Sequence, residues 1–391
     1  MTAVQEALPG LPTDLPAPPR YGRRSVAEVL TSAAASLGVP GYDDVLGLGP
    51  ARRVVVVLVD GLGRAQLRAR AGHAPTLAGA RSLATLDAAF PTTTAASLAS
   101  LGTGTPPGAH GLVGYDVLDP ERDLVVNQLG GWDPGVDART WQPLPTVFER
   151  AAEHVDVVTV SRHRFAGSGL TGAALRGGRF VPADGPAARV TAALDELAAG
   201  RDTLMYFYWD ELDRTGHARG WESWEWTAQL EELDASLRRL VARVPSGTTV
   251  LVTGDHGMVD VAPEARVDYA QLPGLLDGVR HTAGEPRMVQ LHLEPEATAE
   301  DVRHLVGAWR ERFGSRVWLL SREAALAAGY FGAPEQVRET VRGRIGDLLV
   351  AAKDPLALFD LGRVRPSAMA MVGQHGSLTR AEREVPLLRL A

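Results

Sequence analysis

The segment RVVVVLVDG, residues 53–61, decides the fold class of this chain. Its apolar run is continuous rather than alternating, and most of its residues are the β-branched residue valine. Such a run is typical of a strand buried on both faces, as in a parallel sheet that helices cover on either side. The run ends at Asp60 and Gly61, so a carboxylate follows the strand directly.

Three later segments repeat this pattern, and helical segments separate them. We expect strands over residues 154–160, 203–210 and 248–254, and helices over residues 25–37, 144–152, 187–199 and 223–244. This alternation predicts an α/β fold with a doubly wound, mostly parallel sheet. In such sheets ligands bind at the carboxyl ends of the strands, where Asp60, Asp210 and Asp255 would lie together.

Changes in composition along the chain predict four parts. Residues 1–22 are rich in proline and are expected to form an extended N-terminal arm, and residues 23–281 are expected to form the core. Residues 282–366 predict a small α/β insertion or cap, with strands over 288–293 and 317–320 and helices over 299–313 and 321–328. Residues 367–391 are expected to return to the core, beginning with a strand over 367–373.

Composition argues against several classes of protein. The chain has 391 residues, a formal net charge of −7 and no long basic run, so no nucleic-acid-binding surface is expected. It has no cysteine, so histidine and carboxylate must hold any transition metal. No apolar run is long enough to span a membrane, and the proline-rich start lacks the features of a signal peptide. We therefore expect a cytoplasmic protein without membrane contact, and the oligomeric state stays open.

The segment FPTTTAASLASLGTG, residues 90–104, contains the candidate nucleophile. A proline turn and three threonines precede small and apolar residues at helical spacing, which predicts a threonine in the first turn of a buried helix. The unpaired N–H groups and the dipole of a helix start suit a bound phosphate, and a hydroxyl placed there could attack phosphorus. The alternative is an ordinary helix capped by threonine.

Carboxylates and imidazoles near the ends of the predicted strands form a candidate metal-binding set. Asp213 and His217 are four residues apart, which can place both side chains on one side of a helical turn. The whole set is Asp60, Asp213, His217, Asp255, His256 and His375. It suits zinc or a similar divalent ion, and six ligands are enough for two metals about 3.5–4 Å apart that act on a phosphoryl group. Taken singly, each residue has an ordinary role in a turn, a cap or the core as its alternative.

The order of these motifs resembles the alkaline phosphatase superfamily, and within it the type I phosphodiesterase/nucleotide pyrophosphatase family. The resemblance covers roughly residues 53–257 and 367–391. It rests on VDG at 59–61, FPTTT at 90–94, TG, P and HG between 103 and 111, DRTGH at 213–217, GDHGM at 254–258 and QHG at 374–376. It implies an alkaline phosphatase-like core.

The resemblance also implies the roles of the site residues. The nucleophile would be Thr94, the last threonine of the FPTTT turn. One divalent metal ion, expected to be zinc, would be bound by Asp60, Thr94, Asp255 and His256. The second would be bound by Asp213, His217 and His375.

Residues that contact the substrate are less well defined. Relatives that cleave nucleotides have an asparagine soon after the HG turn, whereas residues 112–116 here are LVGYD. Asn127 is a candidate substitute, and Tyr115 and Trp132 are candidates for stacking on a nucleobase, with packing in the core as the alternative. Leu212 replaces the proline that precedes the aspartate of the DxxxH motif in relatives, and Asp210 is an additional acid.

These features predict a metal-dependent hydrolase of phosphodiester or nucleotide pyrophosphate bonds, with a small-molecule phosphoester or nucleotide as substrate. The reaction would use a covalent threonine intermediate and two divalent metal ions. A phosphomonoesterase or phosphonate hydrolase on the same core is the alternative within this class. A non-catalytic protein that binds metal or a phosphoester is the alternative from a different class.

Overall fold

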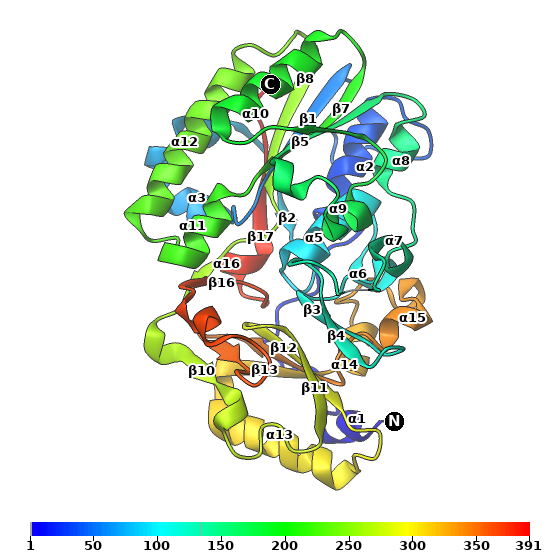
Figure 1. Ribbon diagram of the computed structural model, residues 1–391, viewed down its shortest axis with the longest axis vertical. Helices are drawn as coiled ribbons and strands as arrows, with labels where there is room; N and C mark the ends of the chain where they lie inside the picture. The colour runs from blue at the N-terminus through cyan, green and yellow to red at the C-terminus, as the bar shows by residue number, and fades with distance from the viewer. Residues whose placement is uncertain (1, 134) are drawn as a thin grey trace.

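The computed structural model describes residues 2–133 and 135–391 and contains a larger and a smaller lobe, each built around a sheet (Figure 1). The sheet of the larger lobe has the strand order β2-β17-β8-β1-β7-β5-β6. Its strands are β1 Arg53–Val59, β2 Arg81–Asp87, β5 Asp156–Ser161, β6 Arg179–Pro182, β7 Thr203–Trp209, β8 Thr248–Gly254 and β17 Glu384–Arg389. Strands β8, β1, β7, β5 and β6 are parallel, and β17 is antiparallel to β8 and β2. The predicted doubly wound, mostly parallel sheet is confirmed.

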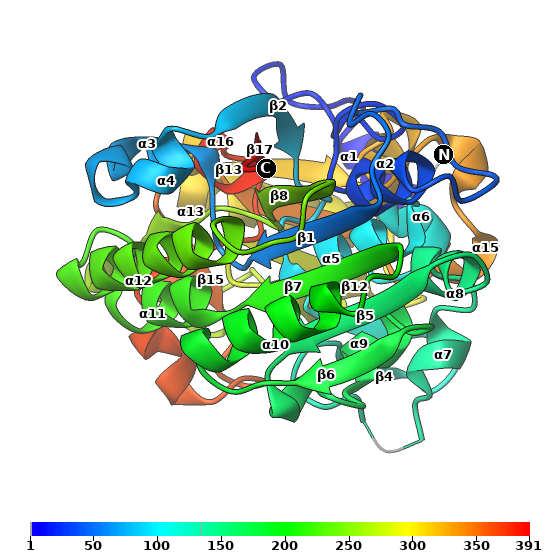
Figure 2. The ribbon, with the colours of Figure 1, turned by 90° about the horizontal axis from the view of Figure 1, so that it is seen from above.

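Strand β1 lies in the middle of this sheet and contributes to two cores. Val54 and Val56 pack on one face, and Val55 and Val57 pack on the other, as a continuous apolar run predicts. Figure 2 shows helices on both sides of the sheet. The first face is covered by α2 Ala27–Ser36, α5 Thr94–Thr103, α8 Val147–Ala151 and α9 Gly169–Ala174, and the second by α3 Arg64–Ala69, α4 Pro75–Ala78, α10 Pro186–Ala198, α11 Glu211–Arg219 and α12 Trp224–Val241.

The smaller lobe is built on a sheet with the strand order β13-β14-β12-β11-β3-β4. Its strands are β3 Asp116–Asp119, β4 Leu124–Asn127, β11 Val279–Glu285, β12 Met288–Leu293, β13 Val317–Ser321 and β14 Leu348–Ala352. Helix α13, Ala299–Phe313, covers one face of it. The short helices α7 Ala138–Trp141, α14 Arg322–Ala327 and α15 Glu339–Arg342 contribute Trp141, Leu326 and Val341 to the core that also contains the first face of the larger sheet, and α6 Pro107–His110 precedes β3 in the chain. The β3-β4 hairpin comes from the sequence that was expected to lie in the core, so the smaller sheet draws on two separate parts of the chain.

The strand expected over residues 367–373 is wrong. Residues Pro366–Ala370 form a 3-10 turn, and only β16, Gly373–Gln374, pairs with β9, Val259–Asp260. Proline at the first position of the turn has no N–H to donate to a ladder. The chain returns to the core sheet as β17 instead, after the short helix α16, Arg380–Arg383.

The N-terminal arm is not wholly extended, because Ala3–Ala7 form helix α1. The Thr2 side chain accepts a hydrogen bond from the Gln5 N–H and caps this helix. Val4 and Leu8 are buried in the same core as α13, which explains why so short a helix is stable there. Among the described helices there is no candidate for a membrane-spanning segment.

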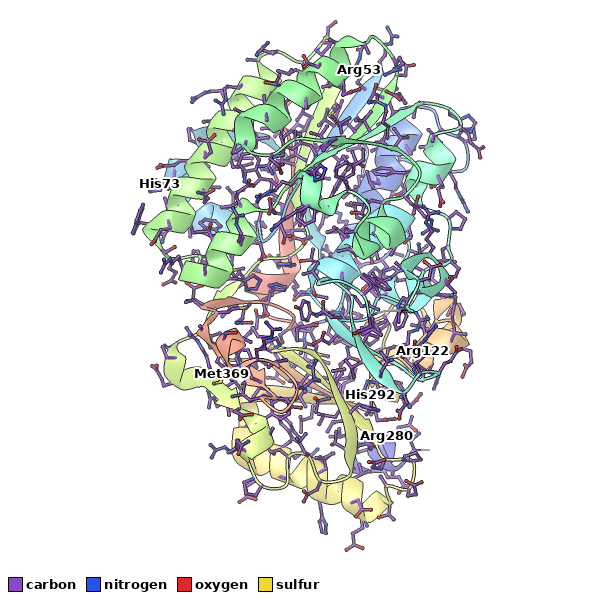
Figure 3. The ribbon with its side chains drawn as sticks, in the orientation of Figure 1. Arg53, His73, Arg122, Arg280, His292 and Met369 are labelled. Atoms are coloured by element: carbon purple, nitrogen blue, oxygen red, sulfur yellow. The ribbon has the colours of Figure 1, made fainter. Side chains whose placement is uncertain are left out.

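The parallel strands point their carboxyl ends toward the smaller lobe. Figure 3 labels Arg53, at the start of β1, far from the smaller lobe, and His292, on β12, within it. Loops that follow the parallel strands therefore meet the smaller lobe, and side chains from both surround the space between them.

Candidate active site

Thr94 lies where the sequence predicts a threonine hydroxyl, in the first turn of a buried helix. It is the first residue of α5, follows Thr93 as the cap residue, and has only 3% of its surface exposed. All residues of α5 are buried, which fixes the position of the helix start. The Thr94 hydroxyl oxygen lies 3.2 Å from His256 Nε2. The threonine is thus held against an imidazole that follows strand β8.

One group of candidate ligands lies at the ends of the adjacent strands β1 and β8. Val59 pairs with Gly254, so Asp60 and Asp255 emerge side by side from the sheet. His256 Nε2 lies 3.5 Å from Asp60 Oδ1 and 3.5 Å from Asp255 Oδ2. One ligand atom from each of these three buried residues lies within 4.8 Å of the others, a separation that a single metal ion can bridge.

A second group joins helix α11 to the loop after β16. Asp213 Oδ2 lies 3.3 Å from His217 Nε2 across one helical turn, as their spacing predicts. His375 Nε2 lies 3.3 Å from His217 Nε2 and 3.9 Å from Asp213 Oδ1. The structure therefore brings all six candidate ligands into the two groups that the resemblance implies, and their binding of metal stays a prediction.

The orientation of the three histidines fits metal binding. Nδ1 of His217 lies 2.7 Å from the Gly373 carbonyl, Nδ1 of His256 lies 2.9 Å from the Gly257 carbonyl, and Nδ1 of His375 lies 2.8 Å from the Thr92 carbonyl. A carbonyl only accepts, so each Nδ1 carries the proton and each Nε2 presents a lone pair. Two such lone pairs then face each other between His217 and His375, which is unfavourable unless a cation lies between them.

Unpaired carboxylate oxygens point to the same conclusion. Asp60 Oδ1, Asp213 Oδ1 and Asp255 Oδ2 are buried and have no hydrogen-bond partner among the described residues. Leaving such an atom unpaired costs on the order of a few kcal/mol. Divalent cations bound by these oxygens and by the free Nε2 atoms would satisfy all of them, so the residues present fit the metal ions.

Burial and crowding change the pKa values of these groups. Burial raises the pKa of Asp60 well above its usual value, and the neighbouring Asp255 and Asp213 carboxylates raise it further. Burial also raises the pKa of Asp255. Burial, together with His256 and His217, holds the pKa of His375 well below its usual value. Neutral imidazoles are the form that binds metal, and a bound cation would favour the charged form of the two carboxyls.

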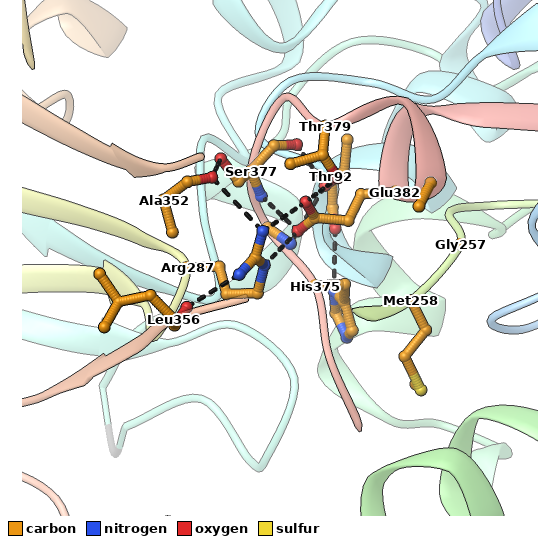
Figure 4. A network of polar contacts seen from close by, with 12 residues as sticks. Thr92, Gly257, Met258, Arg287, Ala352, Leu356, His375, Ser377, Thr379 and Glu382 are labelled. Atoms are coloured by element: carbon orange, nitrogen blue, oxygen red, sulfur yellow. Dashed lines mark hydrogen bonds and ion pairs between the residues drawn. The ribbon is translucent and has the colours of Figure 1, made fainter. Parts of the chain in front are cut away.

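A hydrogen-bond network fixes the loop that carries His375 (Figure 4). Thr92, two residues before Thr94, exchanges backbone and side-chain hydrogen bonds with Gly376 and Ser377. Glu382 accepts from the Ser377 N–H at 3.0 Å, and its carbonyl accepts from the Gly257 N–H at 2.7 Å. The nucleophile turn and both candidate metal groups are therefore tied to one another.

The Glu382 carboxylate forms a buried ion pair with Arg287 from the smaller lobe. Arg287 Nε lies 2.8 Å from Glu382 Oε1, and Arg287 Nη2 lies 2.9 Å from Oε2. Both side chains are 0% exposed, and the remaining Arg287 N–H groups donate to carbonyls of the smaller lobe. The smaller lobe thereby helps to hold His375 in place.

The family model described as type I phosphodiesterase/nucleotide pyrophosphatase matches residues 54–378 of this sequence. The chain belongs to this family. A comparison with curated proteins gives no match. The family match extends through the motifs that position Asp60, Thr94, Asp213, Asp255 and His375.

Solved structures show the same fold for this phosphodiesterase-family chain. Murine ectonucleotide pyrophosphatase/phosphodiesterase 5 is 18% identical with a TM-score of 0.65, over 86% of this chain and 87% of that chain. An inactive variant of the murine protein in complex with AMP is 17% identical with a TM-score of 0.64, over 86% and 87% of the two chains. Phosphonoacetate hydrolase from Sinorhizobium meliloti 1021, in complex with phosphonoacetate, is 20% identical with a TM-score of 0.65, over 87% and 90% of the two chains.

Two cavities meet at Thr94 and Asp213 in this member of the family. The first has a volume of about 680 Å³ and lies between the lobes, where Tyr115 and Asn127 from the β3-β4 hairpin line it. The second has a volume of about 600 Å³ and extends over the carboxyl ends of β5 and β7, where Ser161 lines it. A molecule bound beside Thr94 therefore has room to extend into either cavity.

Of the three candidate substrate-contacting residues, Tyr115 and Asn127 line the first cavity and Trp132 does not. Tyr115 lines the first cavity and stays a candidate for substrate contact. Asn127 also lines it, but its side-chain amide donates to Asp116 Oδ1 at 2.7 Å and its side-chain oxygen accepts from the Leu129 and Gly130 N–H groups, so it organises the start of the loop after β4. Trp132 is buried in the core with 9% exposed, packs edge-to-face on Trp141, 5.9 Å away, and lines neither cavity; this position agrees with the alternative of core packing, and stacking on a substrate stays a prediction.

Sequence reasoning missed several residues that support the site. The Tyr208 hydroxyl donates to Asp60 Oδ2, and the Gly61 N–H donates to Asp255 Oδ1 at 3.1 Å. Asp210, the additional acid, accepts from arginines rather than lying in either candidate metal group. Arg287 and Glu382 were also missed, because the contacts of these residues join positions far apart in the chain.

Proposed function

We propose that this chain is a metal-dependent hydrolase of phosphodiester or nucleotide pyrophosphate bonds, with Thr94 as nucleophile and two divalent metal ions, zinc in each case. The observation that carries the proposal is the pair of ligand groups beside the Thr94 hydroxyl, in which the Nδ1 of every histidine faces a backbone carbonyl, so that each Nε2 presents its lone pair to the group. Asp60, Asp255, His256 and the Thr94 oxygen would hold one ion, and Asp213, His217 and His375 the other.

The chemistry follows from this placement. When bound, the two ions would lower the pKa of a coordinated hydroxyl and offset negative charge on the phosphoryl oxygens. Thr94 Oγ forms a bond to phosphorus as the bond to the leaving-group oxygen breaks, and the leaving group departs with a proton. Water then attacks the phospho-threonine, releases the phosphate product and restores the hydroxyl. Among the described residues no side chain caps the start of α5, so its first N–H groups would be available to stabilise the charge of the same phosphoryl group.

A phosphonate hydrolase is the second candidate function. The observation that favours it is the similarity of fold to the phosphonoacetate hydrolase, whose complex contains a carbon–phosphorus compound. The two candidates share the nucleophile and the metal ions, and they differ in the bond that is cleaved. Release of inorganic phosphate from phosphonoacetate, measured beside hydrolysis of a diester, distinguishes them.

Metal content and hydrolysis measured on one sample test the proposed function. We expect about two zinc ions per chain by mass spectrometry, hydrolysis of bis-p-nitrophenyl phosphate faster than that of p-nitrophenyl phosphate, and loss of both activities on chelation. Faster hydrolysis of the monoester would favour a phosphomonoesterase. Tight metal binding without turnover of any phosphoester would instead support a non-catalytic binding protein.

A further inference from the structure

The two cavities beside Thr94 differ in charge. The second cavity, here called the arginine cavity, is lined by Arg164, Phe165, Ser161, Tyr206, Tyr208 and Arg214, among others. Its acidic lining residues are Asp60, Asp210 and Asp213. Asp60 and Asp213 belong to the candidate metal groups, so Asp210 is the remaining acid to consider.

Arginines already neutralise Asp210. Its carboxylate lies 2.5 Å from Arg164 Nη2, 3.1 Å from Arg162 Nη1 and 3.5 Å from Arg189 Nη1. Of the neighbouring acids, Glu211 pairs with Arg189 at 2.6 Å and the exposed Asp184 lies 3.8 Å from Arg162. The three guanidinium groups and these three carboxylates balance in charge, so the positive charge that remains at this edge of the cavity is that of Arg214, which lies in no ion pair among the described residues.

Two arginines of the lining remain able to contact a ligand. The Arg164 side chain is 53% exposed and stacks on the Phe165 ring, with its guanidinium carbon 4.6 Å from the ring centroid. Arg214 follows Asp213 on α11, is exposed, and forms no ion pair among the described residues. Guanidinium groups in this setting suit a carboxylate or a phosphate.

Two buried hydroxyls provide an independent observation in the same cavity. Ser161 and Tyr206 are 2% and 1% exposed, and neither hydroxyl has a hydrogen-bond partner among the described residues. Both line the arginine cavity, and they lie on the neighbouring strands β5 and β7. Buried hydroxyls normally form hydrogen bonds, so the lack of a partner indicates that a polar group of a ligand forms hydrogen bonds with these two.

The first cavity has the opposite balance of charge. Apart from Asp213, its acidic lining residues are Asp116, Asp133, Glu285 and Asp360, and its basic ones are Arg363 and Arg365. Arg363 is engaged by Asp116 and by the Thr282 hydroxyl, at 3.2 Å in the second case. A substituent that carries negative charge would therefore be directed away from this cavity and into the arginine cavity.

We propose that the arginine cavity binds a second anionic group, a carboxylate or a phosphate, attached close to the phosphorus that Thr94 attacks. This inference rests on the proposed function, because the candidate metal groups would hold that phosphorus. Arg164 and Arg214 bind the anionic group, and the hydroxyls of Ser161 and Tyr206 donate to its oxygens. The favoured substrates are phosphodiesters, phosphoanhydrides or phosphonates with such an anionic arm.

Binding of short phosphonates to the zinc-loaded protein tests this inference by calorimetry. Phosphonopropionate and its amide have the same shape, and only the acid carries the second anion. We expect the acid to bind at least about tenfold more tightly, since a charge-assisted hydrogen bond contributes roughly that factor. In Arg164→Gln and Arg214→Gln the ratio of the two dissociation constants should fall about tenfold. A bisphosphonate of equal length shows which anionic group the arginine cavity prefers. If the bisphosphonate binds more tightly than phosphonopropionate, the preferred group is a phosphate; if it binds more weakly, the preferred group is a carboxylate.

Arg365→Gln is the matched control, because Arg365 lines the first cavity. It should leave the ratio as in the wild type, and a ratio that falls only in this variant places the anionic arm in the first cavity and overturns the inference. Zinc-dependent binding of the amide with no preference for the acid also overturns it while leaving the proposed function intact. If neither phosphonate binds the zinc-loaded protein, the proposed function fails as well.

Discussion

Replacing Arg287 by methionine should destabilise the protein and weaken metal binding at the group that contains His375. Methionine keeps much of the length of the side chain and removes every N–H group that Arg287 donates. Glu382 then stays buried without its cationic partner, although it still accepts from the Ser377 N–H and the Thr379 hydroxyl. The change lies in the smaller lobe and leaves every candidate ligand in the sequence.

The magnitude follows from the burial of the pair. Both side chains are 0% exposed, and two hydrogen bonds of 2.8 and 2.9 Å join them. Removing one partner of such a pair costs about 3–5 kcal/mol of unfolding free energy, because the other charge stays buried. Groups that orient a metal ligand typically contribute about 10–100-fold in metal affinity, so zinc binding at the second group should weaken by that factor.

Urea unfolding of the chelator-treated protein measures the first effect, and titration with zinc measures the second. Arg316→Met is a matched control, because Arg316 and Asp354 form an exposed ion pair, 45% and 49% exposed and 3.6 Å apart, in the same lobe. That variant should lose no more than about 1 kcal/mol. Arg287→Lys retains the charge without the paired N–H groups and should lie between Arg287→Met and the wild type. An Arg287→Met protein within about 1 kcal/mol of the wild type, with unchanged zinc affinity, would refute the reasoning.

Three further predictions concern single side chains. Thr94→Ala should abolish turnover and leave the metal content nearly intact by mass spectrometry; loss of the metals instead would contradict its role as nucleophile. His375→Ala should lower metal occupancy at one of the two groups, and unchanged occupancy and activity would remove the loop after β16 from the site. Burial holds the pKa of His292 at about 3, below its value of roughly 6.5 in the unfolded chain, so protonation favours unfolding as pH falls through this window. His292→Gln should therefore reduce the loss of unfolding free energy between about pH 6 and pH 5 by about 1.4 kcal/mol per pH unit. Unfolding free energies from urea titrations at several pH values measure this, and the same dependence on pH in both proteins would contradict the prediction.

Two of the candidate ligands were predictable because they follow strands directly. Asp60 and Asp255 come immediately after apolar runs, and parallel strands bring their carboxyl ends to one edge. Asp213 and His217 share a helical face, which their spacing indicates. Thr94 begins a helix whose small apolar residues are visible in the sequence. These positions depend on local patterns along the chain, and the resemblance to the family supplied their expected roles and their division into two groups.

Other features depend on contacts that the sequence pattern does not show. The segment over 367–373 has apolar residues but forms a 3-10 turn, whereas β17, with Pro386 within it, completes the core sheet beside β2. The pairing of β17 with β2 and β8 decides that this segment is a strand more than its composition does. The β3-β4 hairpin joins the smaller sheet through a single paired position, Gly284 with Asp116, and no periodicity indicates that partner.

The sequence by itself determined the class of fold and the candidate metal ligands and nucleophile, because the burial of β1 and the residues at strand ends follow from local order along the chain. Only the tertiary structure decided which groups support that chemistry. Arg287 and Glu382 are separated by 95 positions, and Tyr208 and Asp60 by 148, yet both pairs are in direct contact. The same holds for Trp132, whose burial depends on how the loop after β4 folds back onto α7 and α9. Whether a side chain is buried and whether its charge is paired depend on which distant residues contact it in the folded chain, so neither can be predicted from the local sequence.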